Sequence, residues 1–242
     1  MGYKSLAHCA KDLEKHGMLL RIKDEVDPNL EMAEIHRRFF ESGGPALLFE
    51  NVKGSPFPAL SNLYGTFDRT RFLFRNELEK VQKIIELKID PIQLIKKPSR
   101  YLLSPFHALS GLPRKARFSR PIAFGKTSID QLPQVKSWPD DGGAFVTLPQ
   151  VFSMGPDSKD IMKSNLGMYR IQLSGNDYSM NEEIGLHYQL HRGIGVHHKA
   201  YNNSSEAFKV SIFVGGPPSN AFSAIMPLPE NLSELTFAGL LN

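Results

Sequence analysis

The hydrophobic positions near the N-terminus recur first with the period of a helix and then as a run typical of a strand. The apolar residues that share one face of the first predicted helix are Leu6, Cys9, Ala10 and Leu13. Gly17 follows as a natural C-terminal stop. The run Met18–Lys23 then predicts a strand.

A second helix and a strand pair follow. Asp27 is expected to cap the second helix, with Pro28 in its first turn. Met32, Ile35 and Phe39 form its apolar stripe, and Gly43-Gly44 is expected to end the helix. The runs 46–52 and 58–65 predict two paired strands, because turn-forming residues separate them.

Residues 68–87 predict a third long helix with Leu78, Val81 and Ile85 on one side, and Pro91 and Pro98 break the pattern beyond it. The stretch 97–120, rich in Pro, Ser and Arg, predicts a domain boundary.

The second half of the chain has a different texture, with short β runs between frequent turns. These runs are 120–124, 143–152, 167–175, 185–193, 208–216 and 221–229. Several short strands at this spacing favour a barrel or a sandwich, so the fold class is α+β. Ser233 is expected to cap a helix that begins at Glu234, and because the sequence stops two turns later we expect the domain to continue in a longer protein.

Composition narrows the class of protein. The 242 residues are 41% hydrophobic, carry a net charge of +4 and contain one cysteine, Cys9. A disulfide framework is therefore excluded, and Cys9 is expected to act as a small buried hydrophobe. No run approaches the ~18 apolar residues of a membrane span, and the N-terminus lacks the apolar core of a secretory signal, so a cytoplasmic protein is expected.

A basic block lies in the middle of the chain. Between residues 91 and 129 there are eight basic residues and no acidic one. Such a block could bind a polyanion or the phosphate of a cofactor, or simply face solvent. Nucleic acid is not expected as a partner, because the interleaved aromatic residues of a single-strand binder are missing.

The histidines and serines give little support to hydrolytic chemistry. His187 and His191 lie four residues apart, with His197 and His198 close behind, which raises a zinc site as an alternative to surface or pocket histidines. On a strand, however, residues four apart are separated by about 13 Å. No serine has a G-x-S-x-G context, and no glycine-rich loop matches a nucleotide-binding fingerprint.

A polar set remains in the second half. Asn165 opens N-L-G-M-Y-R, Arg170 and Arg192 follow, and Glu234 starts the last predicted helix. Taken singly, Asn165 is also typical of a turn, Arg170 and Arg192 of surface charges, and Glu234 of an acidic residue in the first turn of a helix.

Six ordered motifs together resemble the UbiD family of prenylated-flavin-dependent decarboxylases. They span residues 43–54, 62–66, 142–149, 165–172, 191–193 and 227–241. The resemblance implies an N-terminal α/β domain over 1–115, a split β-barrel like that of flavin reductases over 116–242, and a C-terminal α/β domain that this sequence does not contain.

The resemblance also implies a cofactor set of prenylated FMN, Mn²⁺ and K⁺. Asn165 and Glu234 match the Mn²⁺ ligands, and the backbone carbonyls of Ser223, Ala224 and Met226 match the K⁺ site. The residues that match flavin-contacting positions are Met168, Tyr169, Arg170, His187, Tyr188, Gln189, Arg192 and Gly193.

The implied reaction is reversible, non-oxidative decarboxylation of an aromatic or α,β-unsaturated acid. The modified flavin supplies the electron sink that no side chain provides. Arg170 matches the arginine of a Glu–Arg–Glu network beside the substrate carboxylate, for which its planar fork is suited. The implied partners are the acid substrate, a flavin prenyltransferase that supplies the cofactor, and further copies of the chain through the C-terminal domain.

Two departures qualify the resemblance. Gly193 stands where some members have a histidine as third Mn²⁺ ligand. The two glutamates of the network belong to a motif downstream of Asn242, and Glu182 and Glu183 are not expected to replace them. Three hypotheses stay open: the N-terminal half of a longer or split decarboxylase, a non-catalytic flavin- and metal-binding module, and a structural barrel domain.

Overall fold

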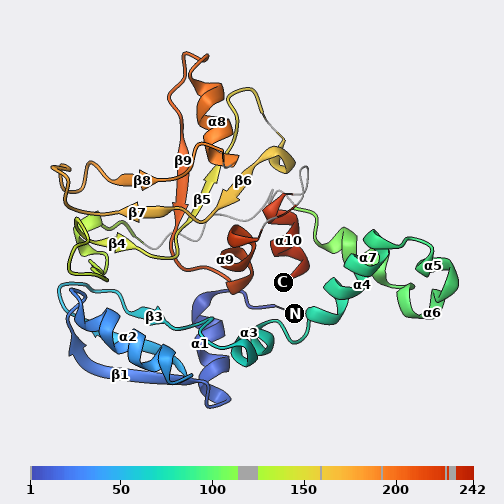
Figure 1. The fold of residues 1–242 in the computed structure, drawn as a ribbon, viewed down its shortest axis with the longest axis horizontal. Coiled ribbons are helices and arrows are strands. Elements are labelled where there is room, and N and C mark those ends of the chain that lie inside the picture. The colour runs from blue at the N-terminus through green and yellow to red at the C-terminus, as the bar shows by residue number, and fades with distance from the viewer. Residues whose placement is uncertain (1, 114–124, 159, 192, 227, 229–232) are drawn as a thin grey trace.

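A computed structural model of the chain describes residues 2–113, 125–158, 160–191, 193–226, 228 and 233–242. It contains a small N-terminal sheet with its helices, a helical arm, and two further sheets that share a core (Figure 1). The expected strand at 120–124 and the expected domain division at 115/116 lie outside the described residues.

The N-terminal part is a three-stranded sheet covered by helices. Its elements are α1 (Leu6–Lys15), β1 (Leu19–Val26), α2 (Glu31–Glu41), β2 (Ala46–Val52), β3 (Ala59–Ser61) and α3 (Phe67–Leu73). Strands β1 and β2 are parallel, and β2 pairs with β3 in antiparallel register. Met32 of α2 packs on Leu47 and Phe49 from one face of the sheet, while Cys9 and Leu13 of α1 pack with Ala46 from the other.

The predicted stripe of α1 is confirmed, since Cys9, Ala10 and Leu13 are all buried. The predicted start of α2 is wrong by one turn. The helix begins at Glu31 after Leu30, and Asp27 instead bonds the Asn29 backbone N–H and Lys53. A short polar side chain competes with the helix by bonding nearby backbone groups, which explains the delay.

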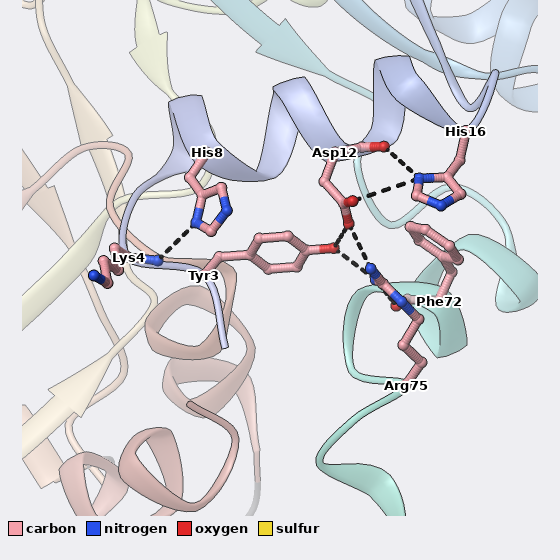
Figure 2. A network of polar contacts seen from close by, with 7 residues as sticks. All are labelled: Tyr3, Lys4, His8, Asp12, His16, Phe72 and Arg75. Atoms are coloured by element: carbon pink, nitrogen blue, oxygen red, sulfur yellow. Dashed lines mark hydrogen bonds and ion pairs between the residues drawn. The ribbon is translucent and has the colours of Figure 1, made fainter. Parts of the chain in front are cut away.

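The predicted helix over 68–87 is two helices, α3 and α4 (Leu78–Ile89), separated by a turn. In that turn Arg75 donates hydrogen bonds to the Tyr3 hydroxyl at 2.9 Å and to Asp12 Oδ2 at 2.8 Å (Figure 2). Tyr3 itself donates to the same Asp12 oxygen at 2.6 Å. These contacts between distant segments set the direction of the chain where local periodicity predicted a continuous helix.

Helix α4 leads into the arm, whose further helices are α5 (Gln93–Lys96), α6 (Pro98–Tyr101) and α7 (Ser104–Ser110). The arm projects to one side, away from all three sheets (Figure 1). Large apolar side chains on it are exposed, including Ile89, Ile95 and Phe106. Of the basic block, Arg100 lies here and pairs with Glu86 at 3.0 Å.

The second half carries two antiparallel sheets. The first has the order β4 (Phe145–Val146), β7 (Arg170–Gln172), β8 (Gly185–His187), and the second has the order β6 (Asn165–Gly167), β5 (Gln150–Ser153), β9 (Val210–Phe213). Val151 and Ile171, one from each sheet, share a core with Ile194 of α8 (Gly193–Tyr201). The described strands do not close into a barrel.

Two helices tie the halves together. The run 221–229, expected as a strand, instead belongs in its first part to helix α9 (Pro218–Ile225), which a proline at the first helical position favours. The last helix, α10 (Glu234–Leu240), begins where predicted, and Ser233 accepts the Leu235 N–H at 3.2 Å. Phe237 and Leu241 complete the core around Cys9, and the Gly2 N–H bonds the Asn242 carbonyl at 2.8 Å.

Candidate functional site

Arg170, the first residue of β7, is held by a carboxylate and by an aromatic ring. Its Nη2 donates to Asp141 Oδ1 at 2.8 Å, and its guanidinium carbon lies 3.8 Å from the centre of the Phe145 ring. Burial alone would raise the pKa of Asp141, but the hydrogen bond and charge of Arg170 outweigh it and hold that pKa below its usual value. The sequence reasoning missed Asp141, which lies twenty-nine positions from Arg170.

His187 lies beside Arg170 on the same sheet. The two residues are paired in the β7–β8 ladder, and the rings of His187 and Phe145 form a T-shaped pair with their centres 5.8 Å apart. A 3.2 Å hydrogen bond joins His187 Nε2 to Gln172 Oε1. Gln172 is buried and is held in turn by Asn176 at 3.0 Å. Arg170 and His187 therefore flank one aromatic ring.

The zinc alternative finds no support. In the described ranges, no three His, Cys, Asp or Glu residues gather as a metal site. His191 is exposed, whereas His197 and His198 lie on α8 and bond Ser153 and Tyr188.

Asn165 and Glu234 lie close together because each is the first residue of an element and the two elements meet there. Asn165 opens β6 and Glu234 opens α10. The backbone N–H of Leu166 donates to Glu234 Oε2 at 3.2 Å, which fixes the carboxylate next to the start of β6. Sixty-eight positions of sequence separate these partners, and the Ser233 cap sets where the helix begins.

The carboxamide of Asn165 lies between Tyr169 and Gly193. The Tyr169 hydroxyl is 3.3 Å from Nδ2 and 3.4 Å from Oδ1. A Cβ atom added at Gly193 would lie 2.2 Å from Oδ1, so only glycine leaves the amide where it is. At the position where the sequence resemblance places a histidine ligand in some family members, a side chain fits here only if the Asn165 amide moves away.

The remaining flavin candidates lie around the link between the two sheets. Met168 and Tyr169 form that link, from β6 to β7. The Tyr169 and Tyr188 rings are 6.3 Å apart, with Gln189 exposed beside them. Arg192 lies outside the described residues.

The backbone carbonyls of Ser223, Ala224 and Met226 lie at the end of α9. The Ala224 carbonyl accepts the Met168 N–H at 3.1 Å, which places this turn against the link between the sheets. The Ser223 and Met226 carbonyls accept N–H groups from Met226 and Leu228. Each carbonyl oxygen has a second lone pair, so these bonds leave room for a cation.

The donor atoms near Asn165 suit a hard cation. An amide oxygen and a carboxylate are ligands that Mn²⁺ and similar ions accept, with phosphate or water oxygens completing the set. The described residues offer these two oxygen donors from β6 and α10, with the exposed Gly193 against the Asn165 amide.

Comparison with protein families gives two matches. Residues 114–242 match the 3-octaprenyl-4-hydroxybenzoate carboxy-lyase Rift-related domain of UbiD proteins, and residues 10–88 match the N-terminal domain of the same carboxy-lyases. A Chlamydia pneumoniae protein, named as one of the subunits of a 4-hydroxybenzoate decarboxylase, is 44% identical over 229 residues, which is 92% of this chain and 37% of the relative. An uncharacterized protein of Aquifex aeolicus is 34% identical over all of this chain and 50% of its own length.

Solved structures share the fold. The vanillic acid decarboxylase of Sedimentibacter hydroxybenzoicus, in closed form, matches with a TM-score of 0.78 at 23% identity, over 100% of this chain and 49% of that chain. The UbiD-class enzyme HmfF of Pelotomaculum thermopropionicum, in an evolved dimeric form with prFMN, matches with a TM-score of 0.74 at 21% identity, over 99% and 51%. The chain thus spans about half the length of these structures, and 37% to 50% of the curated relatives it matches.

Proposed function

The chain belongs to the UbiD family, and from that premise we propose that it forms the flavin- and metal-binding part of a carboxy-lyase. The reaction is the reversible, non-oxidative decarboxylation of an aromatic or α,β-unsaturated carboxylic acid with prenylated FMN. The activity of the whole protein is part of the proposal, because the curated relatives are at least twice as long as the region matched.

The observation that carries the proposal is the meeting of Asn165, Glu234 and Gly193. The Glu234 carboxylate accepts the N–H of Leu166, the residue that follows Asn165, and Gly193 has no side chain to displace the Asn165 amide. This donor set suits Mn²⁺, which in turn would hold the phosphate of the flavin. The carbonyls of Ser223, Ala224 and Met226 are the proposed K⁺ ligands, because they follow one another at the end of α9 and the Ala224 carbonyl accepts the Met168 N–H.

When bound, the prenylated flavin supplies an electron sink for the carbon that loses CO₂. The protein's own part is to bind and orient. Met168, Tyr169, Gly193 and Arg192 are proposed to contact the flavin, with His187, Tyr188 and Gln189 lining the same side.

Arg170 is proposed to hold the substrate carboxylate. Among the described residues only its Nη2 is engaged, by Asp141, so the other N–H groups remain to meet an incoming carboxylate. Asp141 and the Phe145 face fix the plane of the guanidinium before substrate arrives, which reduces the ordering cost of binding. The carboxylates that move the proton are proposed to come from the polypeptide that the relatives have beyond the matched region.

Further parts of the proposal follow the family. The division at 115/116 separates an N-terminal α/β domain from a flavin-binding domain, in which the two sheets form the split β-barrel. A flavin prenyltransferase would supply the cofactor, further copies of the chain would join through a C-terminal domain, and the protein would act in the cytoplasm. Among the described residues, no helix is long and apolar enough to span a membrane.

Cofactor retention tests the first part. The chain is loaded with FMN or prenylated FMN and Mn²⁺, desalted, and analysed by absorbance and by electron paramagnetic resonance of Mn²⁺. Asn165→Ala and Glu234→Gln are expected to lose Mn²⁺ and most of the flavin. Glu182→Gln, the same change at an exposed acid, is the matched control and is expected to retain both. An unmodified chain that retains neither flavin nor Mn²⁺ would overturn the proposal.

Release of CO₂ tests the second part, with the protein as its own gene produces it and a panel of aromatic and α,β-unsaturated acids. Arg170→Lys is expected to lose at least tenfold in kcat/KM, because a point charge does not replace a planar fork. Flavin retention without CO₂ release, even with a complementary C-terminal polypeptide added, would favour the non-catalytic binding module instead.

A further inference from the structure

Helix α8 packs on the face of the β5–β6 pair that carries Asn165. Ser153 and Asn165 are directly opposite in the antiparallel register, so their side chains share a face. Val151, two residues before Ser153, lies on that face too, and it is fully buried in the cluster that contains Ile194 of α8. The helix therefore covers the strand pair next to the candidate metal ligand.

Two residues on one face of α8 make the polar part of this contact. Gly193 and His197 are four positions apart, so they lie on the same side of the helix. Gly193 touches the Asn165 amide, since a Cβ there would be 2.2 Å from Oδ1. One turn later, His197 Nδ1 lies 3.0 Å from the hydroxyl of Ser153, whose residue is only 1% exposed.

The His197 ring also has a partner on the segment that leads into β6. The backbone of Lys163 hydrogen-bonds the ring, and Lys163 ends the short 3₁₀ turn η2 (Ile161–Lys163) two residues before Asn165. The imidazole thus joins three segments that surround Asn165: β5 through Ser153, η2 through Lys163, and α8 itself. With both partners in place the ring is committed, so it is not available as a third metal ligand.

We propose that His197 is a positioning residue for the metal and flavin-phosphate site, because it fixes α8 and the entry to β6 on either side of Asn165 and so sets where the amide oxygen points. The inference rests on the proposed function of Asn165. It assigns to His197 a role distinct from general packing. If the ring is removed, α8 is free to shift, Gly193 moves relative to Oδ1, and a buried serine hydroxyl loses its partner.

The test measures Mn²⁺ and FMN binding together with folding in a set of variants. His197→Ala is expected to raise the Kd of Mn²⁺ in the FMN-loaded chain by about tenfold or more, as loss of a group that orients a ligand does. His197→Asn, whose carboxamide replaces the ring Nδ1 toward Ser153, is expected to recover most of the affinity. Lys199→Ala, an exposed change on the same helix, is the matched control and is expected to leave the Kd unchanged.

A double-mutant cycle with Ser153→Ala separates positioning from general destabilisation. If the contact orients the site, Ser153→Ala and His197→Ala have non-additive effects on the Mn²⁺ Kd, and the bound Mn²⁺ spectrum changes in both. Variants are compared only at temperatures where circular dichroism shows them folded, and Ser153→Ala, which removes the same contact, serves as the disrupting variant if His197→Ala does not fold.

The outcomes distinguish the two proposals. An unmodified chain that binds FMN and Mn²⁺, with a His197→Ala Kd within twofold of it, would overturn this inference and leave the proposed function standing. An effect of His197→Ala that His197→Asn does not rescue would also overturn it. Failure of the unmodified chain to bind FMN and Mn²⁺ would overturn both.

Discussion

Two polar clusters in this protein differ in how far their members satisfy one another. Around Asp12, Oδ2 accepts from both Tyr3 and Arg75, while the His16 ring lies 3.4 Å from Oδ1 (Figure 2). Around Asn165, within the described part of the chain, the Glu234 carboxylate accepts the Leu166 N–H, and the Tyr169 hydroxyl lies 3.3 Å from the amide nitrogen and 3.4 Å from the amide oxygen.

The difference separates structure from function. A carboxylate with an arginine and a tyrosine in place has no need of a ligand, and its contacts stabilise the fold. A carboxylate near an amide oxygen, with no cation from the described residues on either, is the arrangement on which the proposed metal site rests. The first cluster should therefore respond to mutation in stability, and the second in ligand affinity.

The largest expected effect comes from filling the space next to Asn165. Gly193→Ala puts a methyl group where Oδ1 now lies, and the end of a flexible side chain moves easily. The free energy of unfolding should change little, while the Kd of Mn²⁺ in the FMN-loaded chain rises by about 100-fold. Titration of bound Mn²⁺ by electron paramagnetic resonance measures the change.

The matched control for this variant is Gly125→Ala, since a Cβ at Gly125 meets nothing within 4 Å. Its Mn²⁺ affinity should equal that of the unmodified chain. A Gly193→Ala variant that binds Mn²⁺ normally would show that the Asn165 amide oxygen is not a ligand. The cluster around Asn165 would then have no role in metal binding to set against the structural role of the cluster around Asp12.

The second prediction concerns the cluster around Asp12 and how its contribution to stability depends on pH. Burial alone would raise the pKa of Asp12, but hydrogen bonds from Tyr3 and Arg75 outweigh it and hold that pKa below its usual value. The stabilisation is therefore present above the unfolded pKa of about 4 and is lost as the pH falls through the lower folded value. Asp12→Asn should cost about 2 kcal/mol of unfolding free energy at pH 7, and its difference from the unmodified chain should shrink toward pH 3.

Urea unfolding at pH 7, 5 and 3 measures this difference, with Asp24→Asn as the control because Asp24 is exposed on β1. The control should differ little from the unmodified chain at pH 7. A cost for Asp12→Asn that stays constant down to pH 3 would mean that the charge of Asp12 does not stabilise the fold.

The sequence predicted local features well where one segment decides the outcome. The stripe of Cys9 and Leu13 follows from periodicity, and the start of α10 follows from the Ser233 cap. Local patterns failed over 221–225, the first part of a short run expected as a strand, because Pro218 begins a helix there. They failed again at the turn before α4, where Arg75 reaches two partners more than sixty positions away.

The candidate site shows the same limit. Motif resemblance pointed to Asn165, Arg170 and Glu234, whereas Asp141 carried no local signal and His197 was singled out only within the histidine cluster that raised a zinc site. Asp141 lies in a turn rich in Asp and Gly, and its link to Arg170 exists only once β4 and β7 pair. Contacts that depend on sheet register and helix placement cannot be obtained from spacing along one chain.

The smallest expected effect concerns the cluster around Asp12, and the reactivity of Cys9 measures it. Burial raises the pKa of the Cys9 thiol to about 12, and the residue has no exposed surface. Because the thiolate is the reactive form, the folded chain should react with a thiol reagent at pH 8 only when α1 opens, at least 100-fold more slowly than in urea. Tyr3→Phe removes one hydroxyl but keeps the Asp12–Arg75 pair, so it should cost about 1 kcal/mol and speed labelling about fivefold. Labelling as fast in the folded chain as in urea would show that α1 is open, and an unchanged rate in Tyr3→Phe would mean that the hydroxyl does not help to hold it closed.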